Sequence, residues 1–193
     1  MSFTWSSPPD DGGSIVLDYS VEMDDNDDGV YTVVASGLTS TAHIQSGLTA
    51  GNTYKFRAKA RNAVGFSDYS SIFSILAATI PSQPTAPTTT LSGSDIVIDW
   101  NPPTDTGGVS ISGYKLEIKT NTSTFEKDLT NCDAETNSTI QSATSCTVPV
   151  ATLRLDPFYL GDGLSVSARV TATNDCGDST TSSEGNGATI PSS

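Results

Sequence analysis

Basic residues, histidine and cysteine are all scarce in this chain of 193 residues. Nine lysines and arginines stand against 22 aspartates and glutamates, which gives a net charge of −13. This shortage argues against nucleic-acid partners and anionic membrane surfaces, because both require a basic patch. A single histidine, His43, and three cysteines offer no zinc-ligand spacing and no Ser-His-Asp or Cys-His set. The sequence therefore predicts no enzyme activity, no metal site and no cofactor.

Long apolar runs are also missing. No run approaches the ~20 residues that a membrane span requires. Met1 leads into a strand pattern without the basic stretch and apolar core of a secretory signal. We therefore expect no membrane insertion in this segment and, if the protein is secreted, a chain that is part of something longer. Hydrophobic residues make up 35% of the chain, which suits thin two-sheet domains better than helical ones.

What the chain does contain is an internal repeat. The two copies share a tryptophan, a Pro-Pro pair, a Gly-Gly pair, a Tyr-to-Glu segment and an Arg-to-Asn strand followed by glycine. The matching ranges are 3–22 with 98–117, 57–65 with 169–177, and 78–82 with 188–192. A spacing of roughly 100 residues is the size of one domain. We therefore predict two modules, residues 1–80 and residues 81–190, with an insertion in the second around 119–150.

Alternating side chains predict strands in both copies. Residues 54–61 place tyrosine, phenylalanine and alanine on one side and lysine or arginine on the other, as a half-buried strand does. Residues 166–173 alternate in the same way. No stretch keeps the i, i+3, i+4, i+7 spacing of an amphipathic helix. Short strands with frequent turns predict an all-β chain of β-sandwiches.

Together these motifs resemble the fibronectin type III family over nearly the whole chain. The resemblance implies two tandem immunoglobulin-like sandwiches, with a tryptophan between the sheets of each and a tyrosine beside it. In the first copy the motif residues are Trp5, Pro8, Pro9, Gly12, Gly13, Tyr19, Glu22, Gly47, Leu48, Tyr54, Phe56, Arg57, Asn62 and Gly65. In the second they are Trp100, Pro102, Pro103, Gly107, Gly108, Gly113, Tyr114, Glu117, Leu160, Arg169, Asn174 and Gly177.

Two departures from the family pattern matter. Val166 stands where Tyr54 stands in the first copy, so the second module lacks the tyrosine that ties the loop before its strand. The first module lacks strand A, which residues 81–91 supply to the second. A sandwich without that strand exposes an edge to strand addition from another chain. Head-to-tail addition would build a filament.

Cysteines and sequons gather in the insertion. We predict a disulfide between Cys132 and Cys146, which would close a polar loop. Cys176 is left over, and it either pairs outside this segment or stays a free thiol. Asn121 and Asn137 each begin an N-glycosylation sequon. Cysteine pair and sequons together indicate an extracellular or cell-surface location.

The acidic run from Asp24 to Asp28 resembles half of an EF-hand loop. Its twelfth position is Ala35 rather than glutamate, and no helices flank it, so the motif fails. We expect a solvated hairpin turn, and a loose calcium site remains the alternative.

These features predict a non-catalytic extracellular structural or adhesion segment of a modular array, glycosylated and able to form filaments by strand addition. Its partners would be proteins, including further copies of itself. One alternative is a binding or spacer module of a cell-surface receptor or secreted enzyme. Another is an intracellular scaffold of the muscle-giant type, which would have reduced cysteines and unmodified Asn121 and Asn137.

Overall fold

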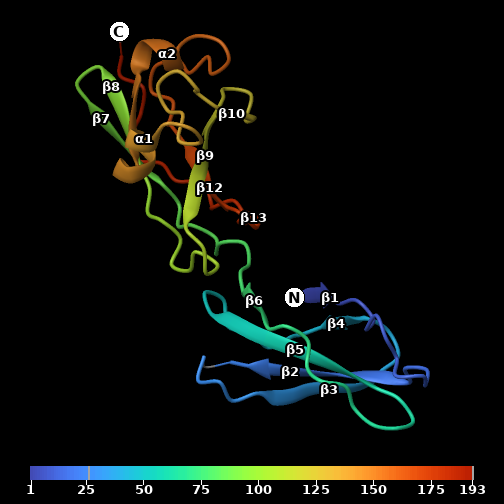
Figure 1. Ribbon diagram of the computed structural model, residues 1–193. Coiled ribbons are helices and arrows are strands. Elements are labelled where there is room, and N and C mark those ends of the chain that lie inside the picture. The colour runs from blue at the N-terminus through green and yellow to red at the C-terminus, as the bar shows by residue number, and fades with distance from the viewer. Residues whose placement is uncertain (26, 193) are drawn as a thin grey trace. The chain divides into compact units, whose positions relative to one another are not determined.

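A computed structural model describes residues 1–25 and 27–192 of the chain. It divides into two compact units, Met1–Ala78 and Thr79–Ser193. Both units consist of antiparallel sheets joined by loops (Figure 1). The all-β sandwich architecture predicted from the sequence is confirmed.

The first unit packs a small sheet against a larger one. Its small sheet pairs β1 (Ser2–Thr4) with β4 (Ala42–Ile44), and its large sheet has the order β3-β2-β5-β6. The strands of the large sheet are β2 (Asp18–Asp24), β3 (Thr32–Leu38), β5 (Thr53–Arg61) and β6 (Phe73–Leu76).

Strand β5 alternates as its sequence predicts. Tyr54 and Phe56 are buried, together with the two alanines that follow, and the basic residues between them face outward. Because few large side chains of this unit are fully buried, partly exposed residues complete its core. These partly exposed residues include Phe3, Trp5 and Phe73.

The second unit repeats this arrangement with one more strand in the small sheet. The small sheet has the order β11-β8-β7 and the large sheet the order β10-β9-β12-β13. The strands are β7 (Thr88–Ser92), β8 (Asp95–Asp99), β9 (Ile111–Lys119), β10 (Phe125–Glu126), β11 (Ser145–Pro149), β12 (Ala168–Asn174) and β13 (Gly177–Asp178).

Two short helices occur in the second unit that the sequence periodicity did not indicate. They are α1 (Ser138–Ala143) and α2 (Val150–Leu153). Helices this short complete too few turns to show a repeating apolar face. A local cap supports α1, since the Asn137 side-chain oxygen accepts hydrogen bonds from the N–H groups of Thr139 and Ile140.

The tryptophan of each unit lies against the tyrosine of the neighbouring sheet. Ring centres are 5.6 Å apart for Trp5 and Tyr19, and 5.6 Å apart for Trp100 and Tyr114, with edge-on geometry in both pairs. Burial differs between the copies. Trp100 is only 3% exposed, whereas Trp5 is only partly buried.

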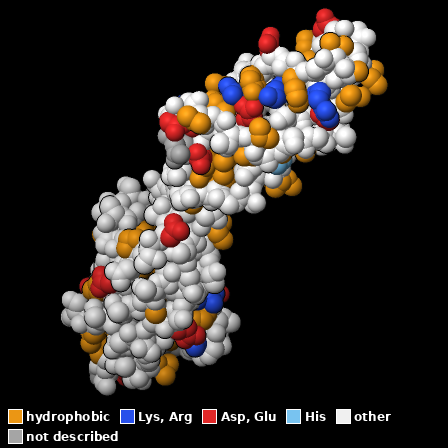
Figure 2. Space-filling view, turned by 90° about the horizontal axis from the view of Figure 1, so that it is seen from below, with side chains coloured by type: hydrophobic (Ala, Val, Ile, Leu, Met, Phe, Trp, Pro, Cys, Tyr) orange, Lys and Arg blue, Asp and Glu red, His pale blue; other side chains and the backbone are white. Residues whose placement is uncertain are grey.

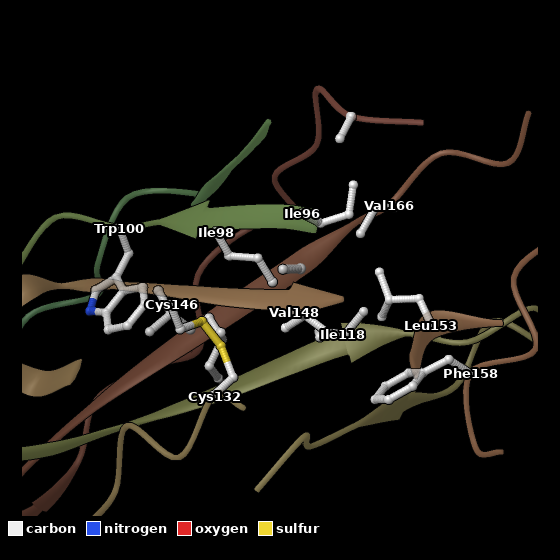
Figure 3. Close-up of a cluster of buried hydrophobic side chains, with 14 of the residues drawn as sticks. Ile96, Ile98, Trp100, Ile118, Cys132, Cys146, Val148, Leu153, Phe158 and Val166 are labelled. Atoms are coloured by element: carbon white, nitrogen blue, oxygen red, sulfur yellow. A yellow bond between two sulfur atoms is a disulfide. The ribbon is translucent and has the colours of Figure 1, made fainter. Parts of the chain in front are cut away.

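The loop before the central strand also differs between the units. In the first unit the Tyr54 hydroxyl accepts a hydrogen bond of 2.9 Å from the Thr49 N–H. Val166 occupies that place in the second unit and is fully buried. There, buried apolar side chains hold the longer loop instead, among them Leu153 and Phe158 (Figure 3).

A disulfide joins Cys132 to Cys146 inside the core of the second unit (Figure 3). The two Cα atoms are 5.3 Å apart, and both residues are buried. Cys146 lies on β11 opposite Ile98 of β8. The bridge therefore attaches the irregular segment before α1 to the small sheet.

Candidate interaction sites

Strand β1 of the first unit is hydrogen-bonded on one side only. Met1 and Gln45 exchange two backbone hydrogen bonds of 2.9 Å, and the Trp5 N–H donates to the Thr41 carbonyl at 3.0 Å. Because backbone groups alternate in direction along a strand, those of Ser2 and Thr4 point the other way. Within the described residues, β4 is the sole strand paired with β1. The far side of β1 is thus an open edge.

A groove of about 460 Å³ runs beside this open edge. One wall comes from β1 and the residues after it, including Thr4, Trp5 and Pro8. The opposite wall comes from the segment before β6, which includes Ser71, and from Phe73 at the start of β6. Three aromatic side chains line the groove: those of Trp5 and Phe73 on its walls and that of Tyr19 on its floor.

The equivalent edge of the second unit is covered. Strand β7 pairs with β8 there, with Thr88 opposite Asp99 and Thr90 opposite Val97. The buried Thr89 hydroxyl donates to the Val166 carbonyl at 2.9 Å, and it accepts from the backbone N–H of Ala188 at 3.0 Å. This extra strand accounts for the deeper burial of Trp100.

A second surface feature lies on the large sheet of the first unit. Every lysine and arginine of that unit is on the outer face of β5. Figure 2 shows Lys and Arg side chains in a row, with hydrophobic and acidic side chains among them. These cations alternate with aromatic rings in a stack that we call the cation ladder. Its members are Tyr31, Arg57, Tyr69, Lys59, Phe66 and Arg61.

Distances within the cation ladder are those of cation–π contacts. The Arg57 guanidinium carbon lies 4.0 Å from the centre of the Tyr31 ring and 3.8 Å from that of Tyr69. The Lys59 nitrogen lies 4.7 Å from the Tyr69 ring centre and 4.8 Å from that of Phe66. The ladder thus links β5 to the segment that follows it and to the β2–β3 turn.

Glu22 lies beneath the cation ladder and neutralises part of its charge. Arg57 donates to its carboxylate at 2.6 and 2.9 Å, and the Tyr69 hydroxyl donates at 2.7 Å. Burial alone would raise the pKa of Glu22, but hydrogen bonds from Tyr69, Arg57 and Lys59 outweigh it, so the pKa lies below its ordinary value. Lys59 in turn donates a hydrogen bond to the Tyr69 hydroxyl oxygen. This bond is the main cause that raises the pKa of Lys59.

The sequence indicated a solvated basic face on β5 but not this stack. The rings come from positions 31, 66 and 69, which no single periodic pattern connects. In the second unit the stack is reduced to one ring, that of Phe125, whose centre lies 4.0 Å from the Arg169 guanidinium carbon and 5.9 Å from the Lys119 nitrogen. Glu117 pairs with Arg169 there at 2.9 Å, as Glu22 pairs with Arg57.

Both sequon asparagines lie at the surface of the second unit. Asn121 and Asn137 are exposed. The Asn137 side chain uses its oxygen to cap α1, and the cap leaves out the nitrogen to which an N-glycan attaches. Cys176 is an exposed free thiol.

The acidic turn between β2 and β3 includes residue 26, which lies outside the described residues. In the described part of the chain, no cluster of three or more histidine, cysteine, aspartate or glutamate side chains could hold a metal ion. None of the described helices is long and apolar enough to span a membrane.

Comparison with known proteins identifies the first unit. Residues 1–75 match the sequence model of the fibronectin type III domain. The first unit is a fibronectin type III domain. The second unit repeats its motif residues and the order of its large sheet, which is consistent with a tandem of two such modules. Domains A168–A170 of titin share this fold, with a TM-score of 0.51 and 19% identity over 91% of this chain and 55% of that one.

Several curated proteins are similar to these modules in sequence. A Kelch domain-containing protein of Saccharolobus solfataricus is 30% identical over 52% of this chain, and titin of Drosophila melanogaster is 29% identical over 69%. Myosin-binding protein H of Gallus gallus is 35% identical over 37%. The chain spans only 14%, 1% and 13% of these three relatives.

Proposed function

We propose that this tandem of fibronectin type III modules is a non-catalytic structural or adhesion segment of an extracellular modular array. The observation that carries the proposal is the combination in one module of a buried disulfide with two exposed sequons. Disulfides persist in oxidising compartments and are rare in the cytosol. Exposed asparagines in loops are accessible to glycosylation.

The described residues also favour a role in binding or spacing over catalysis. The side chains with the most extensive polar contacts, such as Glu22 and Arg57, are engaged with one another on a sheet face. In this proposal the partners of the chain are proteins.

An intracellular scaffold is the principal alternative, and the similarity to titin and to a myosin-binding protein favours it. A spacer or binding module of a cell-surface receptor or secreted enzyme is the other. An extracellular and an intracellular location differ in the expected state of the cysteines and of the sequon asparagines, and both can be measured directly.

Intact mass and non-reducing peptide mapping of the protein from its native source test the proposal. We expect a peptide that contains Cys132 joined to Cys146 and glycan on Asn121 or Asn137. Free thiols at both cysteines together with unmodified asparagines would overturn the extracellular role and favour the scaffold.

Filament formation by strand addition between chains is a second candidate function. It is favoured by one observation, the open edge of β1 with its adjoining groove. Unpaired strand edges are templates for pairing with another chain. This candidate does not depend on location, and its own test is self-association of the purified chain.

A further inference from the structure

We infer that the exposed ring of Tyr159 in the second unit binds the first N-acetylglucosamine of an N-glycan attached to Asn121. The contact deepens the proposed function and rests on it, because it requires the sequon at Asn121 to be glycosylated. It gives a role to an exposed tyrosine that is held in an unusual backbone conformation.

The sequon at Asn121 lies in a tight turn that follows β9. The Thr120 N–H donates to the Thr124 carbonyl at 2.8 Å, and the Ser123 N–H donates to the Thr120 carbonyl at 3.1 Å. The oxygen of the buried Thr120 hydroxyl lies 2.9 Å from that of Thr122 and 2.8 Å from that of Thr124. These bonds fix the turn, so Asn121 leaves the surface from a rigid base.

A backbone hydrogen bond joins this turn to the loop that contains Tyr159. The Asn121 N–H donates to the Phe158 carbonyl at 2.9 Å, and the Phe158 side chain is buried in the core (Figure 3). The covalent bonds from that hydrogen bond to the Cα atoms of Asn121 and Tyr159 add about 5.5 Å. The two Cα atoms therefore lie no more than about 8.4 Å apart. An asparagine side chain with one sugar ring spans that separation.

Tyr159 has a backbone conformation that bulky residues rarely adopt. Its φ is 50°, in the left-handed region that glycine and asparagine tolerate best. Its N–H donates to the Leu155 carbonyl at 2.9 Å, and its hydroxyl donates to the Asp156 carboxylate at 2.9 Å. The side chain is nevertheless 53% exposed. Burial therefore does not account for a tyrosine here, and backbone strain of this kind is typical of ligand contacts.

The surface around Tyr159 matches a neutral sugar. Leu155 lies one turn before Tyr159 and is also exposed, so an apolar area remains in water that a ligand would cover. One face of N-acetylglucosamine carries C–H groups, which pack against an aromatic ring while the hydroxyls stay hydrated at the rim. The bond to Asp156 helps to fix the orientation of the ring. The Asp156 carboxylate also disfavours an anionic ligand, whereas it does not repel an uncharged sugar.

The 193-residue chain secreted from a eukaryotic host tests the contact. Thr139→Ala removes the sequon at Asn137 but keeps the asparagine that caps α1, so any remaining N-glycan is on Asn121. An endoglycosidase trims this glycan to its first sugar before NMR. We expect sugar protons shifted upfield by the Tyr159 ring, with nuclear Overhauser contacts to the ring protons. Absence of these contacts, or an Asn121 without glycan, would overturn the inference.

Thermal unfolding of the second unit measures what the contact contributes. Compared with Asn121→Gln, which carries no sugar, the trimmed protein should melt roughly 2–4 °C higher, as expected for one stacked ring. Tyr159→Asn removes the ring and suits the left-handed backbone, so it should fold and lose this increase. Tyr159→Phe keeps the ring and should retain it. An equal increase in the parent and in Tyr159→Asn would show that the sugar stabilises the unit without the ring.

Peptide mapping of the native protein separates this contact from the proposed function. A Cys132–Cys146 bridge with glycan on Asn137 alone would overturn the contact at Tyr159 and leave the extracellular role in place. Free thiols with both asparagines unmodified would overturn both. Glycan on Asn121 together with the upfield-shifted sugar protons supports both.

Discussion

The guanidinium carbon of Arg57 lies 3.8 Å from the centre of the Tyr69 ring. Arg57 is on β5, and Tyr69 belongs to the irregular segment that precedes β6. That segment also bonds to β5 through its backbone, where the Ser70 N–H donates to the Ala58 carbonyl at 2.7 Å. The cation ladder thus secures a segment that forms no regular strand over most of its length.

Tyr69→Phe separates the two contributions of this residue. The ring and its cation–π contacts remain, but the hydroxyl that donates to Glu22 is lost. Because Glu22 is 5% exposed, we expect the free energy of unfolding of the first module to fall by about 1–2 kcal/mol. Urea unfolding, with amide exchange on β5 as the readout, measures this change in free energy.

The matched control is Tyr159→Phe in the second module. The Tyr159 hydroxyl bonds to Asp156 at the surface, so its loss should change stability by no more than about 0.5 kcal/mol. An equal effect of the two substitutions would contradict a stabilising role for the Tyr69 hydroxyl.

Acid should destabilise the first module through Asp18 and Glu22. A hydrogen bond from Arg61 is the main cause that lowers the pKa of Asp18, and the net effect of the ladder lowers that of Glu22. Both carboxyls therefore bind protons more weakly when folded than when unfolded. Their contribution is fully present above the ordinary pKa values of 3.8 and 4.5 and is lost as pH falls through the lower folded values.

Urea midpoints measured between pH 7 and pH 3 check this expectation. The midpoint of the first module should hold between pH 7 and about pH 5 and fall below about pH 4.5. Glu22→Gln should reduce the fall of the urea midpoint with acidification. A midpoint that rises on acidification would show that the two carboxylates destabilise the module.

Removal of the disulfide should destabilise the second module. Cys132 and Cys146 are 14 residues apart in sequence, and closing a loop of that length is worth about 3 kcal/mol in the chain-entropy model. Cys132→Ala with Cys146→Ala should lower the guanidinium midpoint accordingly. Cys176→Ser is the control, and its exposed side chain predicts almost no change.

Tyr54, whose hydroxyl holds the loop before β5, can be tested by the removal of one oxygen atom. Tyr54→Phe removes the hydroxyl that accepts from the Thr49 N–H. We expect a loss of about 1 kcal/mol, because a partly buried donor is left without its partner. Amide exchange at Thr49 should accelerate, and an unchanged rate would contradict the role of this bond.

Much of the fold was predictable from the sequence. Strand β5 is an example, since strict alternation from Tyr54 onward reflects one buried and one solvated face of a single strand. The helices α1 and α2 were not predictable in this way. They are too short for periodicity, and the Asn137 cap that supports α1 involves only local backbone groups.

The two modules, their sandwich class and the Trp–Tyr pairs could be inferred from residue order alone, as could the places of Cys132 and Asn137. Local alternation and a repeated motif carry that information, because each depends on residues close together in the chain. Two features became visible only in the folded chain. They are the stacking of Tyr31, Tyr69 and Phe66 with the cations of β5, and the groove beside β1. Both features arise where segments distant in sequence meet, and linear spacing does not encode that geometry.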